Sequence, residues 1–140
     1  MRNVYLDYSA TTPVKEEVLK EMLPYFTEKF GNPSSLYDTG LEAKAAVTHA
    51  REQVAALIHA DPKEVFFTAG GTESDNWALF GACDKLKEKG NHIITTKIEH
   101  HAILHSCAFL EKHGFDVTYV GIDKDGRVNL KELEDAITDK

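Results

Sequence analysis

Cysteine is scarce in this sequence, and its spacing excludes several kinds of site. The 140 residues contain two cysteines, Cys83 and Cys107. They lie too far apart for the CxxC spacing of redox motifs and zinc ribbons. Each falls in a stretch whose apolar residues recur at helical spacing, so we expect two reduced thiols packed against apolar neighbours.

Long apolar runs and clusters of positive charge are also missing. No apolar run is long enough to span a membrane, and residues 1–7 lack the apolar core of a signal peptide. Lys and Arg number 16 against 23 Asp and Glu, which gives a net charge of −7, and the basic residues are scattered. Nucleic-acid surfaces need concentrated Lys and Arg. We therefore expect a cytoplasmic protein without a membrane or nucleic-acid partner.

Strands alternate with helices along the chain. Hydrophobic residues make up 42% and charged residues 28%, as in globular proteins. The pattern predicts strands over 65–68, 92–96 and 115–120. It also predicts five helices: one that starts at Thr12–Pro13, one from about Asp38 to His59, one that starts at Thr72, one through Leu104 to Leu110, and one that starts at Asn129. Asn129 and Glu132 have the spacing of a capping box. This order indicates an α/β fold with a mostly parallel sheet and flanking helices. Because no closing strand follows the last helix, we expect the sheet to be incomplete at the C-terminus.

A glycine turn between a strand and a helix is the most informative stretch. The apolar run 65–68 predicts a buried strand, which Gly70 and Gly71 interrupt before a helix starts at Thr72. In this geometry free backbone N–H groups and the helix dipole point at an anion, and Thr72 adds a hydroxyl that can both cap the helix and bind the anion. An ordinary strand-to-helix loop with a threonine cap explains the same residues equally well.

Two acidic residues follow this turn. Glu73 and Asp75 suit the positive end of the helix dipole, but either would repel a phosphate that it faced. We therefore expect both carboxylates to point away from a phosphate pocket.

Histidines mark the end of the next strand. Glu99, His100 and His101 follow the strand over 92–96. Ligands of open α/β sheets bind beyond the C-terminal strand ends, so His100 would offer a flat imidazole beside the phosphate turn. The alternative is a loop histidine that is hydrogen-bonded to its neighbours.

Three metal or nucleotide motifs are only partly matched. His101 and His105 have the spacing of metal ligands on one helical face, but a zinc site needs a third ligand, and the HExxH order is missing. The stretch 121–132 imitates a calcium loop, but Gly121 stands where the first aspartate belongs. Gly70 and Gly71 lack the spacing of a dinucleotide fingerprint. We therefore assign no metal ligand.

Four motifs together carry a resemblance to a known family. They are YLDYSATTP at 5–13, GNPSS at 31–35, FTAGGTESDN at 67–76 and IEH at 98–100. In this order and spacing the chain resembles the cysteine desulfurases, which are pyridoxal-phosphate enzymes of the class V aminotransferase family. The resemblance implies a homodimeric fold-type-I enzyme that converts L-cysteine to L-alanine. Its sulfur, held as an enzyme persulfide, would pass to an acceptor or scaffold protein for iron–sulfur cluster assembly or tRNA thiolation.

The resemblance also implies roles for individual residues. Gly71 and Thr72 would bind the cofactor phosphate, and His100 would stack on the pyridine ring and assist proton transfer. In the family the lysine that holds the cofactor and the sulfur-carrying cysteine lie far downstream, and neither Cys83 nor Cys107 occupies the place of that cysteine. The chain is then the N-terminal portion of such an enzyme, inactive alone.

The expected domain organisation follows from the same resemblance. Residues 1–13 would form an N-terminal arm, and residues 14–140 the first part of the pyridoxal-phosphate-binding large domain. Other readings remain open: a selenocysteine lyase or an aminotransferase of the same family, or a non-catalytic metal-binding domain that uses His101 and His105.

Overall fold

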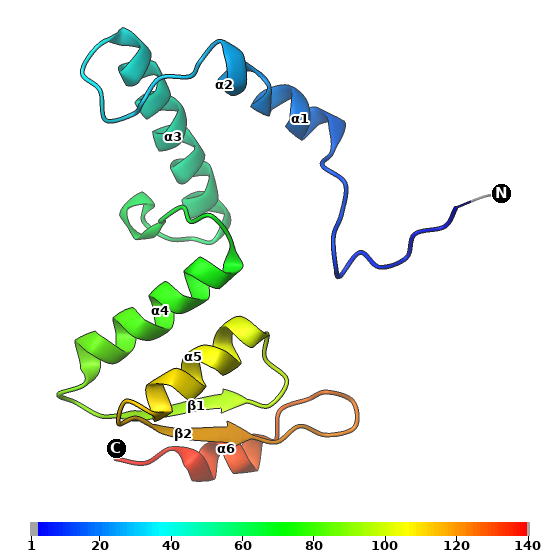
Figure 1. Ribbon diagram of the computed structural model, residues 1–140, viewed down its shortest axis with the longest axis vertical. Coiled ribbons are helices and arrows are strands. Elements are labelled where there is room, and N and C mark those ends of the chain that lie inside the picture. Colours follow the sequence, from blue (N-terminus) through cyan, green and yellow to red (C-terminus); the bar gives the residue numbers. More distant parts are fainter. Residues whose placement is uncertain (1–2, 140) are drawn as a thin grey trace. The chain divides into compact units, whose positions relative to one another are not determined.

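The computed structural model describes residues 3–139 and divides into two compact units. The boundary lies between Phe66 and Phe67, which separates an N-terminal unit from a C-terminal unit (Figure 1). None of the helices described is both long enough and apolar enough to cross a membrane.

The N-terminal unit is helical. It contains α1 (Glu16–Met22), α2 (Pro24–Thr27), α3 (Asp38–Leu57) and the short 3-10 helix η1 (Pro62–Glu64). The prediction of a long helix from Asp38 is confirmed, and α3 ends two residues before the expected position. The predicted helix start at Thr12–Pro13 is wrong, because residues 12–15 are not helical and α1 begins at Glu16 without a side-chain cap. Instead, Glu16 and Glu17 bring negative charge to the N-terminus of α1, where the helix dipole favours it.

Small residues, rather than large apolar ones, form the buried face of α3. Its buried residues are Gly40, Ala43 and Ala55. A Cβ atom on Gly40 would lie 2.6 Å from the Cβ of Ser35 and 2.8 Å from the carbonyl oxygen of Asn32. The turn at 31–35 therefore packs directly on the backbone of α3, and only glycine permits that approach.

The C-terminal unit is an α/β structure. It contains α4 (Gly71–Leu86), β1 (His92–Thr96), α5 (His101–Glu111), β2 (Asp116–Val120) and α6 (Leu130–Ala136). β1 pairs with β2 in parallel, from His92 opposite Asp116 to Thr96 opposite Val120. α4 packs against α5, while α5 and α6 flank the two strands (Figure 1). The predicted strands at 92–96 and 115–120, their parallel pairing and the mixed α/β class are confirmed.

The predicted strand over residues 65–68 is wrong. Within residues 3–139 the sheet has two strands, and residues 65–68 belong to neither. Val65 is extended and 92% buried, with its carbonyl accepting a hydrogen bond from Arg51 Nε at 3.0 Å, whereas Phe66 and Phe67 are exposed. An apolar extended segment becomes a strand only where a second strand pairs with it.

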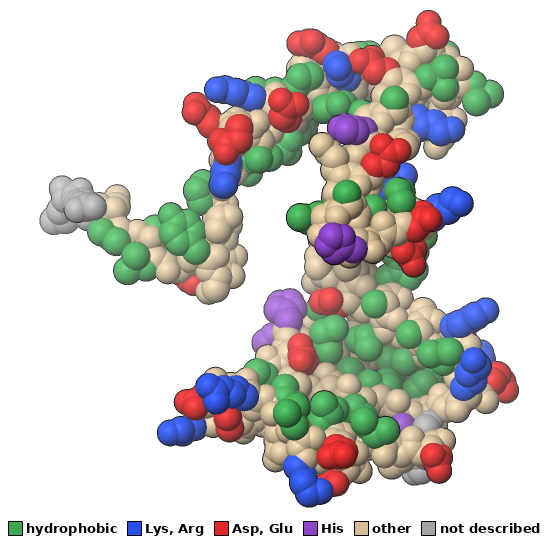
Figure 2. Space-filling model, turned by 180° about the vertical axis from the view of Figure 1, so that it is seen from behind, with side chains coloured by type: hydrophobic (Ala, Val, Ile, Leu, Met, Phe, Trp, Pro, Cys, Tyr) green, Lys and Arg blue, Asp and Glu red, His purple; other side chains and the backbone are tan. Residues whose placement is uncertain are grey.

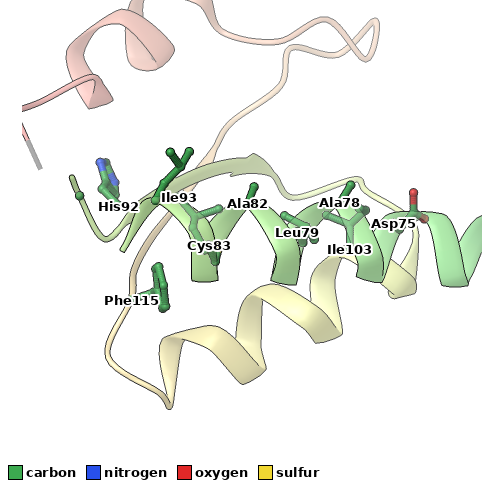
Figure 3. A pocket seen from close by; sticks show the side chains of 11 residues that line it. Asp75, Ala78, Leu79, Ala82, Cys83, His92, Ile93, Ile103 and Phe115 are labelled. Atoms are coloured by element: carbon green, nitrogen blue, oxygen red, sulfur yellow. The ribbon is translucent and has the colours of Figure 1, made fainter. Parts of the chain in front are cut away.

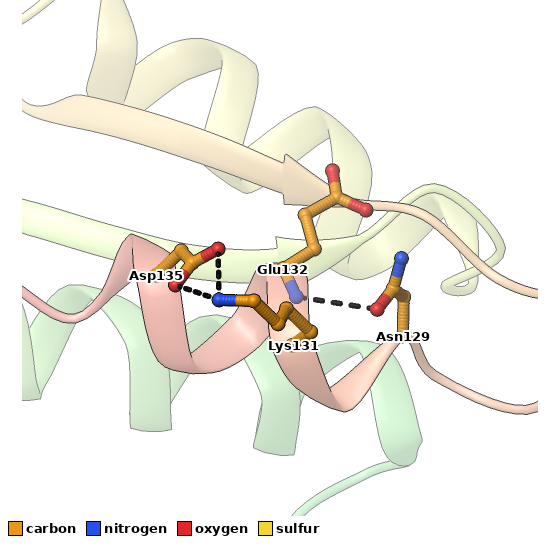
Figure 4. Close-up of polar contacts among 4 residues, drawn as sticks. All are labelled: Asn129, Lys131, Glu132 and Asp135. Carbon is orange, nitrogen blue, oxygen red and sulfur yellow. Dashed lines mark hydrogen bonds and ion pairs between the residues drawn. The ribbon is translucent and has the colours of Figure 1, made fainter.

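The cap of α6 is half of the predicted capping box. Asn129 Oδ1 accepts the N–H of Glu132 at 3.2 Å, as expected (Figure 4). The Glu132 carboxylate does not return to the Asn129 N–H. It accepts the N–H of Gly121 at 2.9 Å, while the Asn129 N–H donates to the Gly121 carbonyl at 3.0 Å. Glu132 thus ties α6 to the end of β2.

The turn at 123–126 is organised by the side chain of its first residue. Asp123 Oδ1 accepts the N–H groups of Asp125 at 2.8 Å and Arg127 at 2.9 Å. This carboxylate therefore stabilises the turn through backbone hydrogen bonds.

Candidate active site

The glycine loop leaves open space at the N-terminus of α4. The helix begins at Gly71, and Gly70 before it has an extended backbone with φ of 169°. A Cβ atom on Gly70 or Gly71 would meet no atom within 4 Å. A cavity of about 560 Å³ lies here, lined by Ala69, Gly70, Gly71, Thr72, Glu73 and Asn76. Because the first N–H groups of a helix have no acceptor within the helix, those of residues 71–73 can bind an anion in this cavity.

Thr72 does not cap α4, so that part of the prediction is wrong. The helix starts one residue earlier than expected, at Gly71, and has no side-chain cap bond. Thr72 instead lies exposed in the first turn and lines the cavity. Its hydroxyl is therefore free of the capping role and can bind a ligand.

Two hydroxyls that were not predicted from the sequence organise the loop. Thr68 Oγ1 lies 2.6 Å from Ser74 Oγ and donates to the Gly70 carbonyl at 3.1 Å. The Ser74 N–H donates to the same carbonyl at 3.2 Å. The hydroxyl residues on both sides of the two glycines are the sequence feature that could have predicted these hydrogen bonds.

The two acidic residues of the first turns behave differently. Glu73 lines the loop cavity, contrary to expectation, because its carboxylate turns back to accept the Ala69 N–H at 2.6 Å. The Glu73 carboxylate thus supplies the loop N–H of Ala69 with a hydrogen-bond acceptor, which the backbone of α4 does not. Asp75 lines a different cavity of about 450 Å³, beside Ala78 and Leu79 (Figure 3).

His100 is both a cap and an exposed ring. It is the N-cap residue of α5, and its Nδ1 accepts the N–H of Ala102 at 3.1 Å. His100 is therefore hydrogen-bonded to a neighbour, as the alternative interpretation of this residue expected. Because Nδ1 is the acceptor, the neutral ring carries its proton on Nε2, which leaves Nε2 and the ring faces for a ligand.

The structure brings Thr72 and His100 to one cavity. This cavity, of about 460 Å³, lies between α4 and α5 and is lined by Thr72, Asn76, Phe80, His100, His101, Ala102, His105, Ser106 and Phe109. Thr72 and Asn76 also line the loop cavity, so the two spaces share a wall. Volumes of about 300–1,000 Å³ are typical of small-molecule sites.

A buried polar contact between α4 and α5 was missed at the sequence level. Ser106 is 4% exposed, and its single O–H is shared between two acceptors, Asn76 Oδ1 and the Ala102 carbonyl, the latter at 2.7 Å. The rings of Phe80 and Phe109 meet edge to face beside it, with centroids 5.6 Å apart. The sequence feature that could have indicated a role for Asn76 is its four-residue spacing from Thr72, which places both residues on one helical face.

Neither cysteine is suited to act as a thiolate. Cys107 is fully buried, as predicted, and Cys83 is half-buried. Burial raises the pKa of both thiols. For Cys107 the nearby Cys83, Glu99 and Glu111 also raise the pKa, while a hydrogen bond from Thr95 opposes the rise. Thiols of this kind are poor nucleophiles at neutral pH.

Comparison with known proteins places these features in a family. The aminotransferase class-V family model matches residues 4–140. The chain is 59% identical over 139 residues to a cysteine desulfurase IscS of Clostridium botulinum, covering 99% of this chain and 35% of the relative. It is 50% identical over 139 residues to a putative cysteine desulfurase IscS 1 of Bacillus subtilis, covering 99% of this chain and 37% of the relative. The chain thus spans about a third of the length of these relatives.

Comparison with solved structures also finds proteins similar to this chain. A NifS-like protein matches with a TM-score of 0.93 and 43% identity, over 97% of this chain and 37% of that chain. A structure described as SspA in complex with cysteine matches with a TM-score of 0.89 and 41% identity, over 96% of this chain and 39% of that chain.

Proposed function

The chain belongs to the aminotransferase class-V family, and from this premise we propose that it acts as part of a pyridoxal-phosphate-dependent cysteine desulfurase. The relatives described above carry the name cysteine desulfurase, and one similar structure was solved with cysteine. The observation that carries the proposal is the cavity that Thr72 and His100 share beside the glycine loop.

The residues of the site fit the proposed cofactor. The phosphate would lie at the N-terminus of α4, where the N–H groups of Gly71 and Thr72 and the Thr72 hydroxyl supply donors. The open space beside Gly70 and Gly71 permits close approach to the backbone. Among the described residues that line the loop cavity, Glu73 carries the one unfavourable charge, and the hydrogen bond of its carboxylate to the Ala69 N–H holds it on the loop.

His100 would supply the flat partner for the pyridine ring and carry a proton at Nε2. While the cap bond to Ala102 holds, Nδ1 carries no proton and the ring offers its Nε2–H to the ligand as a hydrogen-bond donor. For Nε2 to accept a proton from the substrate, the cap bond would open and the ring proton would move to Nδ1. Bound pyridoxal phosphate supplies the electron sink that the amino-acid chemistry needs.

The same proposal extends to architecture and partners. The two-stranded parallel sheet and its helices would belong to a fold-type-I large domain, with residues 1–13 as an arm and residues 14–140 as the first part of that domain. Figure 2 shows hydrophobic side chains gathered on one face of the C-terminal unit, and large exposed apolar areas are typical of surfaces covered in an assembly. L-cysteine would be the substrate, with a homodimer and a cytoplasmic sulfur acceptor or scaffold as partners.

A chimera tests the proposal. The 140 residues would replace the matching segment of the Clostridium botulinum relative, to which they are 59% identical. Sulfide release from L-cysteine would be measured after loading with pyridoxal phosphate, beside selenide release from L-selenocysteine. We expect sulfide from the chimera and none above the free-cofactor background from the 140-residue chain alone. A folded, cofactor-loaded chimera that released only selenide, or neither product, would contradict the proposal.

A further inference from the structure

The spacing of His101 and His105 alone assigns no metal ligand, but from their shared cavity and ring separation we propose that they form a two-histidine site for a divalent transition-metal ion on α5. The two residues lie four apart on the same helical face, and both are exposed. Both line the cavity between α4 and α5, so an ion bound between them would face that cavity. This cavity is also the one that carries the proposed function, but the ion site depends on the two imidazoles and not on bound cofactor.

The ring geometry fits a shared ion. The ring centroids of His101 and His105 lie 5.3 Å apart, with their planes inclined by 62°. Two imidazoles that bind one tetrahedral ion through Zn–N bonds of about 2.1 Å place their ring centroids about 5 Å apart. The rings meet edge to face at about the separation that chelation requires, and rotation of the two side chains, without a change in the path of the helix, would direct a nitrogen of each at one ion.

The surroundings permit a cation. Among the described residues that line the cavity, none is lysine or arginine, and Thr72, Asn76 and Ser106 contribute polar groups. Imidazole is a good ligand for zinc, nickel and copper, and affinity at a given nitrogen site rises from nickel to copper and falls again at zinc. We therefore expect Cu²⁺ to bind more tightly than Ni²⁺ or Zn²⁺.

The ion would keep open coordination positions. In residues 3–139, no group of three or more His, Cys, Asp and Glu side chains forms a metal site. His100 stands nearby, with its ring centroid 6.1 Å from that of His101, but its Nδ1 caps α5. Two protein ligands leave two positions of a tetrahedral ion for water or for a thiolate or phosphate ligand in the cavity.

Calorimetric titration of ZnCl₂ and CuCl₂ into the 140-residue chain tests the site. We expect one ion per chain, and His101→Ala or His105→Ala should each weaken binding roughly tenfold or more, because a bidentate site becomes monodentate. Both residues are exposed on a helix, where alanine is well tolerated. His49→Ala is the matched control, since it removes an exposed helical imidazole with no histidine four residues away.

Imidazole NMR signals provide a second readout that does not depend on heat. Zn²⁺ should shift the ring resonances of His101 and His105 together, at the same ion concentration. No binding at millimolar metal would overturn the proposal. So would binding that His49→Ala weakens as much as His105→Ala.

Discussion

The hydroxyl of Ser106 on α5 donates a hydrogen bond to Asn76 Oδ1 on α4, and this contact joins the two helices that carry the candidate site. Asn76 lies one turn after Thr72, and Ser106 lies on the helix that His100 caps. This partly buried polar pair therefore links the helix that carries Thr72 to the helix that His100 caps.

Ser106→Ala should loosen this junction. The change leaves the half-buried Asn76 amide without its partner, and we expect a loss of about 1–2 kcal/mol in the free energy of unfolding. Thr48→Val is the matched control, because it removes an exposed helical hydroxyl that donates to the Lys44 carbonyl at 2.8 Å, and its effect should stay within about 0.5 kcal/mol. Urea denaturation followed by circular dichroism measures both. Equal midpoints for the two variants would show that the pair does not hold α4 against α5.

Substitutions at His100 separate its cap from its ring. His100→Ala removes the acceptor of the Ala102 N–H and should cost about 0.5–2 kcal/mol of stability. His100→Asn keeps a good cap and loses the ring, so its stability should match that of the parent chain. In the chimera, both variants should lose sulfide release, by about two orders of magnitude or more. If the asparagine variant releases sulfide at the parental rate, the ring has no chemical role.

Thr72→Val tests phosphate binding without disturbing the helix. Because Thr72 does not cap α4, the change should leave stability within about 0.5 kcal/mol. Loss of one charge-assisted hydrogen bond costs about 1.5–3 kcal/mol, so cofactor affinity of the chimera should fall by about one to two powers of ten. Thr72→Ser keeps the hydroxyl and is the control. If the valine variant binds the cofactor as tightly as the serine variant, Thr72 does not bind the phosphate.

The buried thiols predict a fall in stability at high pH. Burial raises the pKa of Cys83 and Cys107, so the folded state holds these protons more tightly than the unfolded state. Their contribution is fully present below the unfolded pKa of about 8.5, and it is lost as the pH rises toward the higher folded values. Unfolding free energies measured across this range should fall, and less so in the Cys83→Ala, Cys107→Ala double variant. Identical slopes for the two proteins would contradict the assignment.

Alkylation provides the kinetic control for the same thiols. Iodoacetamide should modify native Cys107 more slowly than Cys83, and both more slowly than in the urea-unfolded chain, because the reagent attacks exposed thiolates.

Much of the local structure was predictable because it depends on short-range patterns. The apolar runs at 92–96 and 115–120 and the helical spacing between them are sufficient to predict two parallel strands and α5. The proximity of Thr72 and His100 was also predicted, although for a partly different reason. The expectation rested on neighbouring strands, whereas residues 65–68 form no described strand and the cavity that the two residues share lies where α4 packs on α5.

The remaining features depend on tertiary contacts that residue spacing does not encode. The turn of the Glu73 carboxylate back to Ala69 and the bond between Glu132 and Gly121 depend on where neighbouring backbone N–H groups lie in space. Burial of Gly40 in place of the larger apolar residues of α3 depends on the turn that packs against it. A sequence pattern predicts the face of a helix, but the partner of that face appears only in the folded chain.

The central claim is that the N-terminus of α4 and the His100 ring bind one phosphate-bearing pyridine ligand. NMR titration of the isotope-labelled 140-residue chain with pyridoxine 5′-phosphate tests it most directly, because this alcohol cannot react with lysines. We expect the backbone N–H signals of Gly71 and Thr72 and the His100 ring signals to shift together, with one dissociation constant. Pyridoxine without its phosphate should bind far more weakly. Shifts confined to other parts of the chain, or equal binding of the two ligands, would contradict the account.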